Sequence, residues 1–242
     1  QQVMKSLAVR CLDDLCMDGV YFDQVACAAM KPCYDSSHGH PLGGGRWWEQ
    51  GYRQMFTEIR RAFAERGATI VSEQMGEMWL DLIDVYLNAT SYTPHDVPLF
   101  PAVYSGYMLH YGRPVPLDCD AATAFREYAR TLVWGEAFGW IVPFVPMQER
   151  YRDRAALIYR MACLRRDWRE FLVLGTLEDE VRFAQPDPDV FGTVYKDAAG
   201  TREAAFVVNA GLAEKTVRFR FAGAIGEMAV TMGAQSVKRV VR

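Results

Sequence analysis

The chain has 242 residues, half of them hydrophobic, and a formal net charge of -3 at pH 7 from 27 basic and 30 acidic residues. This composition excludes an intrinsically disordered chain and gives no sequence-wide electrostatic reason to bind nucleic acid or an anionic membrane surface. No apolar run reaches the roughly 18 to 20 residues that a membrane-spanning helix needs. The first residues do not resemble a signal peptide, and the sequence indicates no particular cellular location.

The first two thirds of the chain alternate helical and strand patterns, which is typical of parallel βα units. Apolar residues at helical spacing predict helices at residues 4–15, 52–63, 76–81, 125–133 and 154–164. Apolar runs predict buried strands at residues 19–23, 68–73, 83–87, 100–105 and 138–142. The pattern therefore predicts five consecutive βα-type strands.

From about Asp167 the pattern changes to short strands separated by turn residues. The predicted strands lie at residues 171–175, 190–196, 204–209, 216–221 and 227–232. Apolar and polar residues alternate in the fourth of them, as expected for a strand with one buried face. We therefore expect the C-terminal part of a (β/α)8 catalytic barrel at residues 1–166 and a small antiparallel, β-sandwich-like domain at residues 167–242.

Five βα-type strands are too few to close an eight-stranded barrel. The chain also starts within a helical pattern and does not start with methionine. The predicted fold class is thus α/β, a partial TIM-type (β/α) barrel with about strands four to eight, followed by the β domain. We expect an upstream part of the same polypeptide to complete the barrel.

Two acidic residues each close one of the predicted barrel strands. Asp23 follows the apolar residues 20–22, and Glu73 ends the strand at residues 68–73. In a parallel βα barrel the reactive groups lie where strands run into the following loops. Glycoside cleavage needs two carboxyl groups, one as acid and one as nucleophile or base, and Asp23 and Glu73 are the predicted catalytic pair. The alternative is that they cap the next helix or pair with an arginine.

Glu77 competes with Glu73 for the role of the acid. It lies four residues further along, and in a helical turn both carboxyl groups could face the same mouth of the barrel. We keep Glu77 as a reserve acid or a sugar-binding residue.

The loop after Asp23 combines aromatic and short polar residues, which is the composition of a sugar subsite. His38, His40, Trp47 and Trp48 are its predicted substrate-binding residues. A metal site of the two histidines with Asp35 or a cysteine is an alternative, although His-x-His alone is a weak signal. Among the six cysteines, which form no CxxC motif, Cys27 and Cys33 are the pair to consider for a disulfide or a metal. The favoured prediction includes no cofactor and no catalytic metal.

Two further residues follow predicted strands and could contact a sugar. His95 comes after the third strand, next to Asp96, and Tyr104 lies near the end of the fourth. Both are predicted to bind substrate hydroxyl groups. Carbohydrate is accordingly the only partner that we expect besides the rest of the polypeptide.

The sequence contains the motifs DGVYFDQ at residues 18–24, Cys33, HGHPLGGG at residues 38–45, the pairs Trp47-Trp48 and Gly51-Tyr52, Ser72-Glu73 with Glu77, DVYL at residues 84–87, VPLFPAVY at residues 97–104 and Tyr111-Gly112. Together these motifs resemble a bacterial family of glycoside-hydrolase-like (β/α)8 barrels of mostly unassigned activity. The resemblance spans roughly residues 18 to 143. An Asp after strand four and a Glu after strand five are also similar to the nucleophile and acid/base of retaining α-glycosidases of the α-amylase and endo-α-N-acetylgalactosaminidase kinds.

The resemblance implies an O-glycosyl hydrolase that retains the anomeric configuration, with Asp23 as nucleophile and Glu73 as acid/base. Two other functions fit the same residues. A barrel that binds carbohydrate without turnover needs only the aromatic and hydrogen-bonding groups, and a metal-dependent hydrolase would use the His38/His40 loop.

Overall fold

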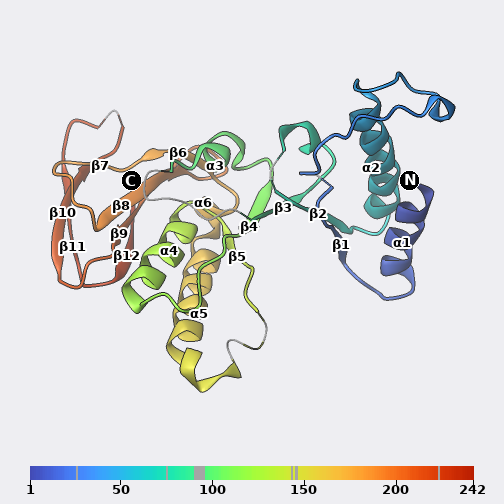
Figure 1. Cartoon of the computed structure of the whole chain (residues 1–242). Coiled ribbons are helices and arrows are strands. Elements are labelled where there is room, and N and C mark those ends of the chain that lie inside the picture. Colours follow the sequence, from blue (N-terminus) through green and yellow to red (C-terminus); the bar gives the residue numbers. More distant parts are fainter. Residues whose placement is uncertain (26, 75, 90–95, 143, 145–146, 223) are drawn as a thin grey trace. The chain divides into compact units, whose positions relative to one another are not determined.

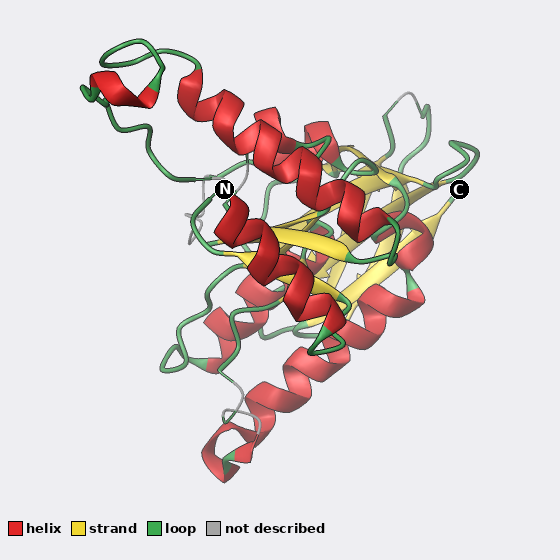
Figure 2. Cartoon of the chain, turned by 90° about the vertical axis from the view of Figure 1, so that its right-hand side faces the viewer, coloured by secondary structure: helices red, strands yellow, loops and turns green. Residues whose placement is uncertain are grey.

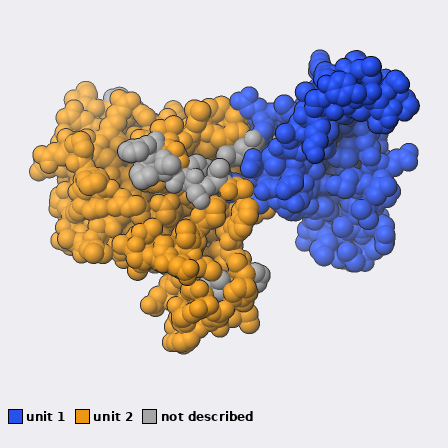
Figure 3. All heavy atoms as spheres, viewed as in Figure 1, with its two compact units in different colours: residues 1–88 blue, residues 89–242 orange. Residues whose placement is uncertain are grey.

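The computed structural model describes residues 1–242 apart from 26, 75, 90–95, 143, 145–146 and 223. The chain divides into two compact units, Gln1–Asn88 and Ala89–Arg242 (Figure 3). No helix in the described part of the chain is both long and apolar enough to cross a membrane.

Unit 1 is built from strands and helices in alternation (Figure 1). Its elements are α1 (Gln2–Asp13), β1 (Gly19–Phe22), the 3-10 turn η1 (Ser36–His38), α2 (Trp47–Ala64), β2 (Thr69–Glu73), the 3-10 turn η2 (Glu77–Trp79) and β3 (Val85–Asn88). The strands pair in the order β1-β2-β3, and both pairings are parallel. Helices α1 and α2 lie side by side (Figure 2). The predicted parallel βα units are therefore confirmed here.

Helix α2 buries one side of itself against the strands. Met55, Phe56, Ile59 and Phe63 recur at helical spacing and are all buried. Phe56 meets Phe22 of β1 edge to face, with ring centroids 5.3 Å apart. Because side chains alternate along a strand, the neighbours of Phe22 point to the opposite face of the sheet.

Asp84 connects the loop before β3 to β2 and to α2. Its Oδ2 atom accepts hydrogen bonds from the backbone N–H of Ile70 at 2.8 Å and from Arg60 Nη1 at 2.9 Å. The carboxylate thus satisfies a backbone donor and a guanidinium at once, and it fixes the entry to β3.

Replacing Asp84 with alanine is expected to lower the free energy of unfolding by about 1 to 3 kcal/mol, because it leaves a backbone donor and a cation without their partner. The matched control is Asp81→Ala, which breaks an Asp–Arg pair between α2 and the same loop, with Arg53. That aspartate is 64% exposed, so its loss should cost at most about 1 kcal/mol. Thermal unfolding of both variants tests this, and equal losses would contradict it.

Unit 2 begins with two parallel strands and continues into antiparallel sheets. Its elements are α3 (Leu99–Tyr104), β4 (Leu109–Gly112), α4 (Ala121–Val133), β5 (Ala137–Phe138), the 3-10 turn η4 (Glu149–Tyr151), α5 (Arg152–Asp167), α6 (Arg169–Leu172), β6 (Thr176–Glu180), β7 (Arg182–Phe183), β8 (Val190–Lys196), β9 (Glu203–Asn209), β10 (Lys215–Arg220), β11 (Met228–Met232) and β12 (Ser236–Val241). Strands β4 and β5 pair in parallel, with α4 between them in the sequence. The other strands form two antiparallel sheets, β12-β9-β8-β6 and β11-β10-β7.

Strand β9 separates two hydrophobic cores, which explains why its residues 204–208 are all apolar. Ala204, Phe206 and Val208 pack with the helical residues of α4, α5 and α6. Ala205 and Val207 face the second sheet and pack with Phe219 and its neighbours. The region that follows the helices is therefore a β domain with two facing sheets. The boundary between residues 166 and 167 stays a prediction.

Two segments that were predicted to be strands are helical. The first of them contains Tyr104. Residues 100–104 of the predicted strand fall in α3, so Tyr104 ends a helix. The strand comes later in the chain, as β4. Pro98 and Pro101 are tolerated because the first N–H groups of a helix have no partner within it.

Residues 171–175 likewise begin in α6, where Phe171 and Leu172 are buried, and the strand follows as β6. Short apolar runs do not distinguish a buried helix from a buried strand. The strand predicted at residues 138–142 is shorter and lies earlier, as β5, and Trp140 has a left-handed backbone.

Candidate active site

The two predicted catalytic carboxyl groups lie at the same end of neighbouring parallel strands. Phe22 of β1 pairs with Ser72 of β2, so Asp23 and Glu73 follow one residue later at matching positions. The Ser72 hydroxyl donates to the carbonyl of Phe22 at 2.8 Å and ties the two strand ends together. Phe22 and Ser72 are buried on the side of α2. By alternation, Asp23 and Glu73 project from the other face.

The residue after each carboxylate has an unusual backbone conformation. Gln24 has φ 57° and Gln74 has φ 56°, both in the left-handed region that side chains other than glycine rarely adopt. Each such residue costs on the order of 1 to 2 kcal/mol, and strain of this kind persists where the surroundings enforce it, often at functional sites. Gln74 donates its N–H to Leu87 O at 2.7 Å, which fixes the end of β2 against β3.

The surroundings of Glu73, including the Asp23 carboxylate, shift its pKa. Loss of hydration raises the pKa of Glu73, and a side-chain hydrogen bond to Asp23 and the charge of that carboxylate raise it further. A backbone hydrogen bond from Gln24 acts in the opposite direction. The pKa of Glu73 is raised because a neighbouring carboxylate disfavours a second negative charge.

Three residues near the pair were not predicted from the sequence. The Tyr21 hydroxyl donates to Asp23 Oδ1 at 3.1 Å, and the two residues share a face of β1 through the two-residue alternation, a signal that could have identified Tyr21. Gln24 contributes only its backbone, which no sequence pattern reports. Burial, and then the charges of Glu73 and Asp23, raise the pKa of the Cys27 thiol. Cys27 is therefore kept neutral and is a poor nucleophile.

Glu77 is exposed at the start of η2, beyond the left-handed Gln74. The segment between Glu73 and Glu77 is therefore not the continuous helical turn that would point both carboxyl groups the same way. After reduced hydration, the contacts that raise the pKa of Glu73 come from Asp23.

The predicted substrate-binding residues of the loop lie in a row of aromatic contacts. His40 stacks on Trp47 with centroids 4.4 Å apart, and Trp47 meets Trp48 at 5.5 Å. Trp48 continues the row to Tyr52, and Tyr52 to the buried Trp79 of η2. The row therefore packs the start of α2 against its own loop and against η2.

Part of this row stays open to solvent. Trp47, Trp48 and Tyr52 line a shallow apolar hollow of about 260 Å³ together with Met55 and Gln1. Aromatic faces in such a hollow can stack on the apolar side of a sugar ring, so Trp47 and Trp48 remain predicted binding residues.

The other predicted binding residues are not joined to the carboxyl pair. His95 lies outside the described residues. Tyr104 belongs to unit 2, where its ring packs on Phe100 at 4.7 Å. Cys27 and Cys33 are both free thiols, and Cys33 lies beside His38.

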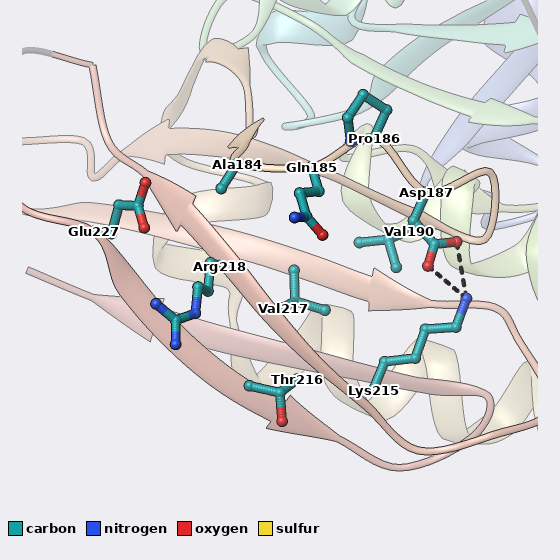
Figure 4. Close-up of a pocket in the computed structure, with 10 residues that line it drawn as sticks. All are labelled: Ala184, Gln185, Pro186, Asp187, Val190, Lys215, Thr216, Val217, Arg218 and Glu227. Carbon is teal, nitrogen blue, oxygen red and sulfur yellow. Dashed lines mark hydrogen bonds and ion pairs between the residues drawn. The ribbon is translucent and has the colours of Figure 1, made fainter.

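The β domain contains a larger hollow, of about 680 Å³ (Figure 4). Lys215 projects into it and is held by both oxygens of Asp187 at 2.7 and 2.8 Å. The ten residues that line the hollow include no aromatic side chain, and their two carboxylates, Asp187 and Glu227, pair with Lys215 and Arg220. It therefore lacks the aromatic platform of a sugar subsite.

Known proteins resemble the chain in sequence. Residues 1–115 match the family model DUF6259, a domain of unknown function. A protein of Bacteroides thetaiotaomicron named "Putative glycoside hydrolase" is 31% identical over 187 residues, which are 75% of this chain and 28% of that protein. A Monosiga brevicollis protein of the same name, with the number 22789, is 32% identical over 135 residues, 51% of this chain and 11% of that protein. The resemblance inferred from the motifs is thereby confirmed, and the chain spans little more than a quarter of these relatives at most.

Solved structures resemble the chain in fold. A debranching enzyme of Nostoc punctiforme has a TM-score of 0.58 at 13% identity and covers 98% of this chain and 59% of its own. A noncanonic maltogenic α-amylase of Thermotoga neapolitana has a TM-score of 0.58 at 12% identity, and the match covers 99% of this chain and 63% of that enzyme. An α-N-acetylgalactosaminidase of Bifidobacterium bifidum has a TM-score of 0.53 at 16% identity, and the match covers 86% of this chain and 33% of that enzyme. At these identities the likeness concerns the fold, and it confirms the predicted class, part of a (β/α) barrel followed by a β domain.

Proposed function

We propose that the full-length protein is a retaining O-glycosyl hydrolase in which Asp23 is the nucleophile and Glu73 the general acid/base. The observation that carries the proposal is the placement of the two carboxyl groups one residue beyond the paired Phe22 and Ser72, at the same end of adjacent parallel strands, together with the pKa of Glu73, which its surroundings and Asp23 raise. The relatives named as glycoside hydrolases support the reaction class. Carbohydrate is the proposed substrate.

The environments of the two groups suit different roles. Asp23 Oδ1 accepts a hydrogen bond from the Tyr21 hydroxyl at 3.1 Å, which orients the carboxylate for attack. Glu73 keeps its proton to a higher pH because it is less hydrated and lies beside that charge. A carboxyl group whose surroundings raise its pKa is suited to the role of the general acid.

The reaction follows from this division. The Asp23 carboxylate attacks the anomeric carbon while the glycosidic C–O bond breaks and the Glu73 proton passes to the leaving oxygen. The product of this step is a glycosyl ester on Asp23. Glu73, now a carboxylate, takes a proton from water, whose oxygen attacks the anomeric carbon and releases Asp23.

The placement of the carboxyl groups at the ends of adjacent parallel strands favours retention over inversion. Retaining pairs are about 5 to 5.5 Å apart, whereas inverting pairs need about 6.5 to 9.5 Å to admit a water molecule. A pair on adjacent strands, whose axes lie roughly 4.8 Å apart, fits the shorter separation.

The configuration of the first product tests the proposal. The full-length protein is screened on chromogenic α- and β-glycosides, and the cleavage of a hydrolysed substrate is followed by proton NMR. We expect the anomer of the substrate to appear first and to mutarotate afterwards. Initial formation of the opposite anomer would exclude a nucleophilic Asp23, and binding of sugars without any cleavage would favour a carbohydrate-binding barrel instead.

A further inference from the structure

A cysteine and two histidines converge in the loop between β1 and α2. The Sγ atom of Cys33 lies 3.3 Å from Nδ1 of His38. One ligand atom from each of Cys33, His38 and His40 can be chosen such that all lie within 4.8 Å of one another. A tetrahedral zinc ion with bonds of about 2.3 Å to sulfur and 2.0 to 2.1 Å to nitrogen holds its ligand atoms roughly 3.3 to 3.6 Å apart. The cluster needs only a small closure to reach that spacing.

The ring nitrogens of both histidines that face away from the cluster have acceptors. Nε2 of His38 lies 3.3 Å from Oδ2 of Asp35. Nδ1 of His40 lies 2.8 Å from the carbonyl oxygen of Pro41, and because a carbonyl only accepts, this nitrogen carries the proton. Metal-binding histidines nearly always donate their second N–H to a carboxylate or a backbone carbonyl, which fixes the ring and its tautomer. Both histidines have this arrangement.

His40 leaves a lone pair without a partner. With the proton on Nδ1, its Nε2 atom is an acceptor, and this atom is buried with no hydrogen-bond partner in the described part of the chain. Buried polar atoms without a partner are uncommon and point to a water or an ion at the site. Trp47 stacks on the same ring at an interplanar angle of 9° and holds its orientation.

The backbone around the cluster is already organised. Cys33 and Gly43 exchange two backbone hydrogen bonds, of 3.0 and 2.6 Å, and so close the segment that carries both histidines. Asp35 is fixed by the backbone N–H and the hydroxyl of Ser37 at 2.8 and 2.6 Å. Long loops without regular structure need a stabilising device of their own, and most described side chains between Asp23 and Arg46 are at least partly exposed.

We propose that Cys33, His38 and His40 bind one zinc ion that holds this loop in place, with the fourth position left to water or another donor. Thiolate and imidazole ligands suit zinc. The proposal is independent of the carboxylate mechanism, because its test measures metal and not turnover.

The test is a titration of the purified, chelator-treated full-length protein with Co²⁺ as a spectroscopic substitute for Zn²⁺. We expect one equivalent to give a tetrahedral visible spectrum and a thiolate-to-cobalt charge-transfer band, both removed by competing Zn²⁺. Cys33→Ser should abolish the charge-transfer band, and His38→Gln and His40→Gln should weaken binding. Asp35→Asn should weaken it about 10- to 100-fold, as loss of an outer-shell partner does.

The matched control is Cys27→Ser, which removes a thiol of the same loop that bonds to the backbone oxygen of Gln24 and not to a histidine. This variant should bind Co²⁺ as the wild type does. A second measurement needs no substitution: Zn²⁺ should protect Cys33 from alkylation by iodoacetamide, as mapped by peptide mass spectrometry. Absence of stoichiometric binding in the wild type, an unchanged spectrum in Cys33→Ser, or Cys33 alkylation unaffected by Zn²⁺ would overturn the proposal.

Discussion

Asp23→Asn in the full-length protein should reduce glycoside turnover by about 10⁴-fold or more, the upper end of what a positioned catalytic group contributes. An amide cannot form the glycosyl ester, so the first step of the reaction fails. The fold should persist, because asparagine keeps the size of the side chain and an acceptor for the Tyr21 hydroxyl. Turnover on a chromogenic glycoside, together with the thermal midpoint, measures both statements.

Asp18→Asn is the matched control for this variant. Asp18 is an exposed aspartate just before β1, at the opposite end of the strand that carries Asp23. Its variant should retain wild-type turnover. If Asp23→Asn keeps a substantial part of the activity, or if both variants lose it equally, Asp23 is not the nucleophile.

Glu73→Ala is expected to lower turnover of substrates with poor leaving groups by about 10² to 10⁴-fold, since they depend on protonation by the general acid. Substrates with good leaving groups need no protonation, so their first step should be nearly unaffected. Azide should rescue the second step because it attacks the glycosyl ester without a general base. The measurement compares aryl glycosides of graded leaving-group ability, with and without azide.

The pH profile gives a second readout of the same residue. Reduced hydration, and then Asp23, raise the pKa of Glu73, and the acid acts in its protonated form. Activity should therefore fall as the pH rises through this raised value, and Glu73→Gln should lose that part of the profile. Glu77→Ala serves as the comparison. If it, rather than Glu73→Ala, depends on the leaving group and responds to azide, Glu77 is the acid.

The location of the carboxyl pair could be predicted because the information is local. Each acid closes a short apolar run, and parallel neighbours bring such positions to one end of a sheet. Matching positions of Asp23 and Glu73 then follow from a register that no single strand reveals. The influence of Asp23 on the pKa of Glu73 depends on that register, so it required the structure.

Elsewhere the sequence was ambiguous for physical reasons. The strand predicted at residues 100–105 rests on a short apolar run, yet Pro98 and Pro101 are compatible with a first helical turn, and α3 takes its place. The weak His-x-His signal at His38 and His40 becomes specific only because chain folding brings Cys33 to the same point. Contacts of this kind depend on loop geometry, which residue spacing does not encode.

The left-handed backbone conformations of Gln24 and Gln74 restrict which substitutions can raise the thermal stability of this protein without loss of activity. Gln24→Gly and Gln74→Gly would remove backbone strain and are obvious choices for a stabilised library. Glycine also frees the chain to leave the conformation in which Gln24 N–H contacts Glu73 and Gln74 N–H is anchored to Leu87. Selection for thermal stability alone would therefore favour variants in which the two carboxyl groups are no longer held in position. A screen for such variants must measure turnover as well as thermal stability.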